Sequence, residues 1–166
     1  MLQSVRHLRT FALVAAVSGA AFAAACNDDD DDATGPQEEE FTVTMNGANE
    51  RPNPVTTNAT GSAELSFTGS GAISYTITVN GLSGPASAAH IHGPADASQT
   101  ADPIVTFTGL STSTSGQLAS GSISSTGVAT VSLDSLKRLL RNGRAYINVH
   151  TAANQPGEIR GQIIAQ

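Results

Sequence analysis

Apolar and polar side chains alternate along most of the chain from Phe41 onward, and this alternation restricts the fold more than any other feature. Phe41, Val43 and Met45 share one side of the first segment. A period of two residues places successive side chains on opposite faces of a β-strand, so each segment is expected to bury one face. Turns rich in glycine or proline separate the segments. The pattern predicts nine short strands, at residues 41–45, 62–67, 73–79, 88–92, 104–108, 117–123, 128–133, 145–151 and 158–165.

We therefore expect an all-β fold, an antiparallel β-sandwich similar in style to immunoglobulin or superoxide dismutase domains. Residues 134–143 depart from the period of two and predict one short helix. Asp134 or Ser135 can cap its start, and Gly143 can close its end. Its leucines share one helical face: Leu136, Leu139 and Leu140.

Basic side chains gather on the other face of this helix and just beyond it. They are Lys137, Arg138, Arg141 and Arg144. The simplest interpretation is a solvated face. The alternative is contact with anionic lipid headgroups or with the protein's own acidic segment.

The negative charge of the chain is concentrated near one end. Eight of the fourteen acidic residues lie within residues 27–40, whereas residues 41–166 carry six acidic and six basic residues and hence no net charge. Nucleic acid is not an expected partner, because binding its phosphates requires a basic surface. The acidic segment contains few apolar residues and predicts an extended, disordered tether.

The first 25 residues predict export. Arg6 and Arg9 precede an apolar stretch at residues 11–22, which is too short to cross a bilayer as an ordinary transmembrane helix. This arrangement is typical of a signal peptide, which we place at residues 1–25.

Cys26, the sole cysteine, follows three alanines. Small residues followed directly by cysteine resemble the lipobox of bacterial lipoproteins, in which the cysteine becomes the acylated N-terminus. The resemblance implies a lipid anchor on Cys26, a tether over residues 26–40 and a domain over residues 41–166 held on the periplasmic or cell-surface side of a membrane. Ala23 stands where a lipobox usually has leucine, so cleavage that leaves a free thiol and a secreted protein is the alternative.

Three histidines, His90, His92 and His150, fall in two short segments of the predicted domain. On a strand, His90 and His92 point to the same side, opposite Ile91. His150 follows Asn148 on the polar side of another predicted strand. We expect both strands to direct their histidines to a polar face.

These segments read AHIHGPA at residues 89–95 and INVHT followed by PGEIRGQ within residues 147–162. Together with residues 47–65 (GANERPNPVTTNATGSAEL), they closely resemble the CHRD domain, which is named for chordin and is frequent in bacterial exported proteins. The resemblance covers residues 41–166. Glu50-Arg51-Pro52-Asn53-Pro54-Val55 replaces the commoner E-V-P-P-V of the family in one loop. The resemblance implies an extracytoplasmic module but assigns no agreed activity.

The sequence leaves three functions open. The first is a binding or structural module of the cell envelope, with a periplasmic or extracellular protein or polymer as ligand. The second is a zinc or copper site, with redox activity as a variant of this function, formed by His90, His92 and His150 with Glu158 or Asn148 as a further ligand or supporting partner. Its structural alternative has the same histidines bonded to loop backbone and Glu158.

The strand motif His-x-His is also similar to the copper site of copper/zinc superoxide dismutases, although the further zinc-loop histidines are missing. The third function is a hydrolase with Glu158 as acid or base beside His150 and Arg160. A plain ion pair between Glu158 and Arg160 is the alternative to that role. We find no nucleophile elbow or phosphate-binding loop.

Overall fold

The computed structural model describes residues 37–124 and 130–166. The predicted signal peptide, Cys26 and the run of aspartates lie outside the described residues. Within the described ranges, no helix is long and apolar enough to span a membrane. The features below belong to one compact unit, Thr34–Gln166.

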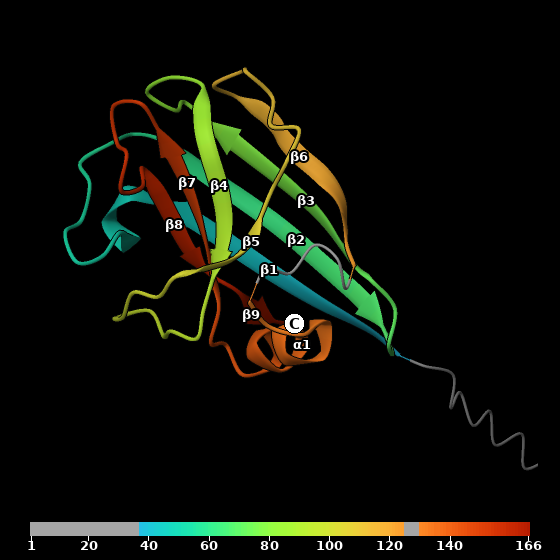
Figure 1. The fold of residues 1–166 in the computed structure, drawn as a ribbon. Helices are drawn as coiled ribbons and strands as arrows, with labels where there is room; N and C mark the ends of the chain where they lie inside the picture. The colour runs from blue at the N-terminus through green and yellow to red at the C-terminus, as the bar shows by residue number, and fades with distance from the viewer. Residues whose placement is uncertain (1–36, 125–129) are drawn as a thin grey trace, which may run out of the picture. The chain divides into compact units, whose positions relative to one another are not determined.

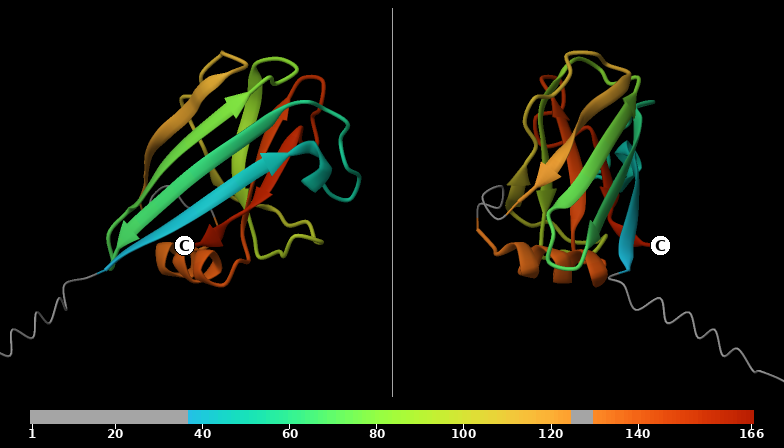
Figure 2. Two further views of the ribbon diagram at one scale, coloured as in Figure 1. Left: turned by 180° about the vertical axis from the view of Figure 1, so that it is seen from behind. Right: turned by 90° about the vertical axis from the view of Figure 1, so that its right-hand side faces the viewer.

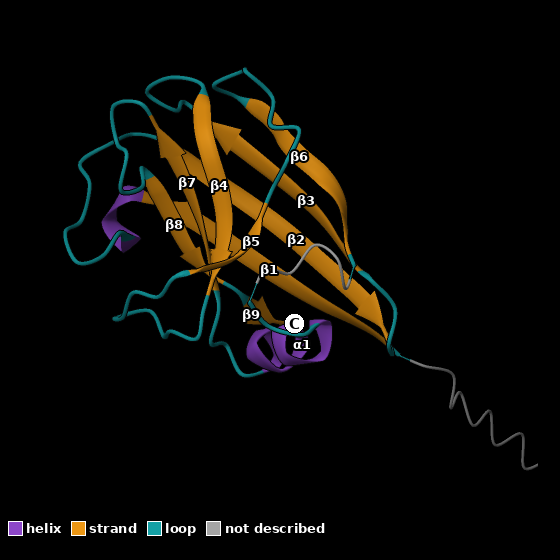
Figure 3. Ribbon diagram, viewed as in Figure 1, coloured by secondary structure: helices purple, strands orange, loops and turns teal. Residues whose placement is uncertain are grey.

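Nine strands form an antiparallel sheet in this part of the chain, and one α-helix accompanies it (Figures 1 and 3). The order along the sheet is β5-β4-β7-β8-β1-β2-β3-β6, and β9 also pairs with β1. The strands are β1 (Glu38–Asn46), β2 (Thr60–Thr68), β3 (Ile73–Asn80), β4 (Ala86–His92), β5 (Pro103–Thr106), β6 (Gly116–Ile123), β7 (Tyr146–Thr151), β8 (Ile159–Gln162) and β9 (Ile164–Ala165). A 3-10 turn, η1 (Gly47–Asn49), follows β1, and helix α1 (Leu133–Arg141) lies between β6 and β7.

The hydrogen bonds join all nine strands into one sheet, so the predicted division into the two sheets of a sandwich is not observed. Strand β8 pairs with β7 along its length and meets β1 where Arg160 lies opposite Asn46. The sheet curls into half a barrel (Figure 2). Gly161 permits the close approach of β8 to β1, because a Cβ atom there would lie 2.3 Å from the carbonyl oxygen of Thr44.

The predicted alternation fills the core inside the curl. Phe41, Val43 and Met45 are all buried, and the equivalent positions of the other long strands join them in one apolar cluster. Every predicted strand overlaps an observed one except residues 128–133. There, Thr130 to Ser132 are not in a strand and Leu133 begins α1, while residues 128 and 129 lie outside the described ranges.

Helix α1 packs its leucines against the core as predicted, but a different residue caps it. Leu136 and Leu140 are fully buried. The N-cap is Ser132, whose hydroxyl accepts a hydrogen bond from the Ser135 backbone N–H at 3.1 Å, rather than Asp134 or Ser135. Gly143 follows the helix with a φ of 59°, the left-handed conformation that glycine adopts without strain.

The expected solvated basic face is wrong for Lys137. This side chain is only 2% exposed, and its Nζ donates to the carbonyl oxygens of Gly69 and Gly71 at 2.7 and 2.5 Å. Arg141 forms an exposed ion pair with Glu39. Glu39 was expected in the tether, but it lies in β1, which begins at Glu38.

Candidate metal centre

Three neighbouring strands, β4, β7 and β8, carry the polar face that the sequence predicts. The register sets His90 of β4 opposite Asn148 of β7, and Asn148 opposite Arg160 of β8. His92 lies opposite Tyr146 in the same way. Residues two apart on a strand share a face, so these polar side chains project from one side of the sheet. The alternate side chains are fully buried in the core: Ile91, Ile147 and Val149.

The three predicted histidines meet on this face. One ring nitrogen of each lies within 4.8 Å of those of the other two. Nδ1 of His90 and Nε2 of His150 are 3.2 Å apart. Zinc–nitrogen bonds of about 2.0–2.1 Å in a tetrahedral site separate two ligand nitrogens by about 3.3 Å. The His90–His150 pair already has the spacing of two ligands, and His92 lies close to it.

Backbone carbonyls fix the protonation of two of the rings. Nδ1 of His92 lies 2.9 Å from the carbonyl oxygen of Ala101, and Nδ1 of His150 lies 2.9 Å from that of Gln155. A carbonyl oxygen can only accept, so each Nδ1 carries the proton and each neutral ring keeps its lone pair on Nε2. Metal-binding histidines are oriented by the same kind of contact. The predicted contacts with loop backbone therefore exist for His92 and His150, and they leave the lone pair of each ring on Nε2. That of His150 accepts from Nδ1 of His90, whereas that of His92 has no partner.

Burial keeps His92 neutral. Burial lowers the pKa of His92 to about 4, against a smaller raising effect of the hydrogen bond with Ala101, and the nearby His90, His150 and Arg160 lower it further. Burial, followed by the charge of His150, also lowers the pKa of His90. Metals bind the neutral imidazole, so protons compete little for His92 at neutral pH.

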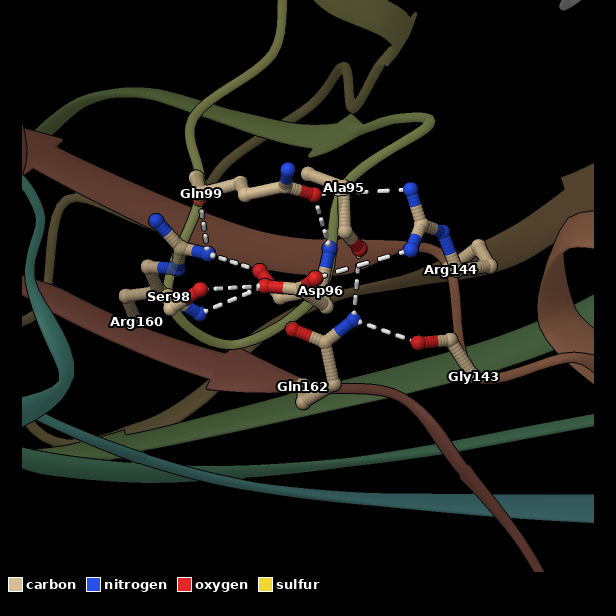
Figure 4. A network of polar contacts seen from close by, with 8 residues as sticks. All are labelled: Ala95, Asp96, Ser98, Gln99, Gly143, Arg144, Arg160 and Gln162. Carbon is tan, nitrogen blue, oxygen red and sulfur yellow. Dashed lines mark hydrogen bonds and ion pairs between the residues drawn. The ribbon is translucent and has the colours of Figure 1, made fainter.

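Residues 93–102 form a loop beside His92, and side chains from β8 hold it in place (Figure 4). Nη2 of Arg160 donates to the carbonyl oxygens of Asp96 and Gln99 at 3.2 and 2.7 Å. Nε2 of Gln162 donates to the carbonyl oxygens of Ala95 and Gly143 at 2.9 and 2.8 Å. Arg160 thus acts as a positioning residue for the loop that presents the Ala101 carbonyl to His92.

Tyr146 links the same loop to the ring of His92. The two rings are stacked, with centroids 4.8 Å apart and planes 3° from parallel. The Tyr146 hydroxyl accepts from the backbone N–H of Ala101 at 3.2 Å. The guanidinium of Arg160 lies 3.5 Å from the centre of the tyrosine ring. Stacking and the two loop contacts leave the His92 ring little rotational freedom.

Four buried side-chain atoms in the described part of the chain have no hydrogen-bond partner, and all belong to this face or to the segment against it. They are Glu50 Oε1, His92 Nε2, Asn148 Oδ1 and Gln162 Oε1. Each is an acceptor, given the proton on Nδ1 of His92. Buried acceptors in native proteins are nearly always satisfied, by protein, water or an ion. Of the four residues, only His92 belongs to the histidine cluster, and its Nε2 is an acceptor that a cation there would satisfy.

Glu50 belongs to this face, but the sequence gives no signal for it. Glu50 is 3% exposed, and Asn148 Nδ2 donates to its Oε2 at 3.3 Å. Burial raises the pKa of Glu50 to about 7, although Arg160, Asn148 and Arg51 act to lower it. An acidic residue within the segment NERPNP is typical of a solvated loop, which is why sequence reasoning missed it.

The structure does not place Glu158 with the histidines. Its Oε1 accepts from the Thr57 hydroxyl and the Ser83 N–H at 3.0 and 2.9 Å, and its Oε2 from the Ser83 and Thr151 hydroxyls at 2.6 and 2.7 Å. Burial acts to raise the pKa of Glu158, but these hydrogen bonds outweigh it and hold the pKa below its ordinary value. These four hydrogen bonds make Glu158 a link between separate segments of the fold. Arg160 is not one of its partners.

Fold and site together define a small, single-sheet antiparallel domain with a cluster of three histidines on one face. The model of the CHRD domain family matches residues 41–163, and the chain belongs to that family. Chordin of Danio rerio is 36% identical over 130 residues. The match covers 76% of this chain but only 13% of that relative, so the chain corresponds to a small part of Chordin.

Proposed function

We propose that this CHRD domain binds one zinc or copper ion through His90, His92 and His150. The observation that carries the proposal is the cluster itself: a ring nitrogen of each histidine lies within 4.8 Å of those of the other two, and Nε2 of His92 is buried without a hydrogen-bond partner. Imidazole nitrogen suits both zinc and copper. The carbonyl contacts at Nδ1 of His92 and His150 hold these two rings in the tautomer that leaves Nε2 as the ligand atom.

Metal binding is tested on the full chain carrying Cys26→Ala, which removes the thiol as a competing ligand. Competition with a chelator and elemental analysis after dialysis are expected to give one ion per chain. Replacing all three histidines with alanine should lower the affinity at least about 100-fold. Losing only a contact that supports a ligand already lowers metal affinity by about 10- to 100-fold, and losing the ligands themselves should lower it further.

The matched control is His7→Ala, which removes a histidine outside the domain and should leave the affinity unchanged. Thermal melts of the metal-free proteins show whether the triple variant still folds. A folded wild-type domain with no measurable affinity for zinc or copper would falsify the proposal, as would an unchanged affinity in the folded triple variant.

We further propose that the domain is exported and anchored to a membrane through Cys26, where it serves as a binding module for a protein or polymer of the envelope. The signal-like residues 1–25 support export, and membership of the CHRD family supports a binding or structural role. Acyl chains on one cysteine give stable attachment without a transmembrane helix.

Anchoring is tested by expression in a bacterium, followed by fractionation and mass analysis. The wild-type chain is expected in the membrane fraction with an acylated N-terminus at Cys26, and Cys26→Ser in the soluble fraction. Because serine lacks the thiol that receives the lipid, none of the Cys26→Ser protein is expected in the membrane fraction. A soluble wild-type protein with an unmodified Cys26 would contradict the anchor and leave the secreted form.

A further inference from the structure

The proposed centre has three protein ligands and one solvent-facing side. In the described ranges, the metal-binding group contains His90, His92 and His150 and no carboxylate. His92 is 8% exposed, whereas His90 and His150 are half-buried. Tyr146 and the loop that carries Ala101 cover the His92 side. Sites with three protein ligands leave a coordination position for an outside molecule, whereas structural zinc sites close with a fourth.

Two buried carboxylates, of Glu50 and Glu158, lie outside the histidine group. Both oxygens of Glu158 accept hydrogen bonds from Thr57, Ser83 and Thr151. One oxygen of Glu50 accepts from Asn148 and the other has no partner, and the charge of Arg160 acts on the carboxylate. Neither carboxylate is grouped with the histidine nitrogens. The described part of the domain therefore offers the ion no anionic ligand.

The charge of the centre selects the kind of outside ligand. Three neutral imidazoles leave both positive charges of a divalent ion uncompensated. The buried guanidinium of Arg160 lies on the same face, where the carboxylate of Glu50 offsets part of its charge. An anion gains from the charge of the ion in a partly buried site, where screening by water is weak.

We propose that the ion held by His90, His92 and His150 keeps a coordination position open to solvent, and that an anionic donor from outside the domain binds there. This inference rests on the proposed metal site. The donor is a small anion or the carboxylate of an acidic side chain on a partner. The CHRD domain thereby gains a means of recognising an acidic ligand through its metal.

The test uses the copper(II)-loaded full chain with Cys26→Ala, titrated with azide as the probe anion. We expect a saturable change in visible absorption, with one azide per copper and with the copper retained on the protein. Acetate and a short peptide with one aspartate then compete with azide. Competition by both assigns the position to carboxylates in general, and competition by the peptide alone assigns it to an acidic partner.

A designed fourth ligand provides an independent test. Ala88 lies directly opposite His150 and on the same side of β4 as His90. Ala88→His therefore places a further imidazole at the cluster and should reduce azide affinity at least about 10-fold while copper stays bound. Ser62→His adds a histidine on an exposed position of β2 and should leave azide affinity unchanged.

The outcomes separate this inference from the proposed function. A chain that binds no copper overturns the proposed function itself. Copper bound at one per chain without any response to azide overturns only the open position, as does azide that strips the copper. Undiminished azide affinity in copper-loaded Ala88→His places the anion elsewhere and also overturns it.

Discussion

Replacing Glu158 with alanine is expected to lower the free energy of unfolding by about 4 kcal/mol, because the change removes a buried carboxylate that accepts four hydrogen bonds from separate parts of the chain. The carboxylate accepts hydrogen bonds from Thr57, Ser83 and Thr151. Alanine leaves these groups without an acceptor in a position that is 0% exposed. Urea denaturation of the metal-free proteins at neutral pH measures the difference.

The same variant decides between a structural and a metal-binding role for Glu158. Because Glu158 is not grouped with the histidines, folded Glu158→Ala should keep the wild-type affinity for zinc or copper. Glu64→Ala is the matched control, since Glu64 is exposed on β2 and its loss should change stability by less than about 0.5 kcal/mol. A stable Glu158→Ala protein that has lost its metal would instead make Glu158 a ligand.

Acid should weaken the contribution of Glu158. The pKa of its carboxyl is lower in the folded chain than its ordinary value, so the folded state holds fewer protons on this group than the unfolded state. Its stabilisation is present above the ordinary pKa and disappears as pH falls through the folded pKa.

The sequence predicts the strands well because their period of two is a local property. Phe41, Val43 and Met45 had to share a face whichever sheet contained them. The curl into one sheet is not local. It depends on the approach of β8 to β1 at Gly161, where a side chain would collide with the carbonyl of Thr44, and alternation is the same in a sandwich and in a curled sheet.

Lys137 illustrates why the burial of a charged residue is hard to predict from the sequence. Helical periodicity places it beside the buried Leu136, and a lysine there is usually solvated. Its burial depends on two carbonyl oxygens, of Gly69 and Gly71, that lie far away in the sequence. Phe67 also lies beneath the ammonium, with its ring centre 4.7 Å from Nζ.

The candidate site was also predictable where it depends on the alternation along a strand. His90 and His92 are two residues apart on one strand, and Asn148 and His150 on another, which is enough to predict a shared polar face. The carbonyls of Ala101 and Gln155 that orient two of the rings belong to loops, and no periodicity places a loop carbonyl. Glu50 enters the face in the same way, from a segment with no strand pattern.

Replacing Glu50 with glutamine is expected to stabilise the metal-free protein by about 3 kcal/mol at pH 8 and by little at pH 4.5. Burial raises the pKa of Glu50 to about 7 from an ordinary value of 4.5. Between these values the folded state binds more protons than the unfolded state, so wild-type stability from this group falls as pH rises. Glutamine keeps the shape without the charge, and its amide can donate to the unpartnered Oδ1 of Asn148.

His92 makes stability change with pH in the opposite direction, and the Glu50→Gln protein should reveal this dependence. Burial lowers the pKa of His92 to about 4 from 6.5, so the unfolded state binds more protons over this interval and stability rises with pH. The two slopes offset each other in the wild type between about pH 4.5 and 6.5, and stability then falls toward pH 7. The variant should instead rise from about pH 4 to 6.5 and then level off, measured by urea denaturation with a chelator present. Lower stability of Glu50→Gln at pH 8 would show that the fold needs the Glu50 charge beside Arg160.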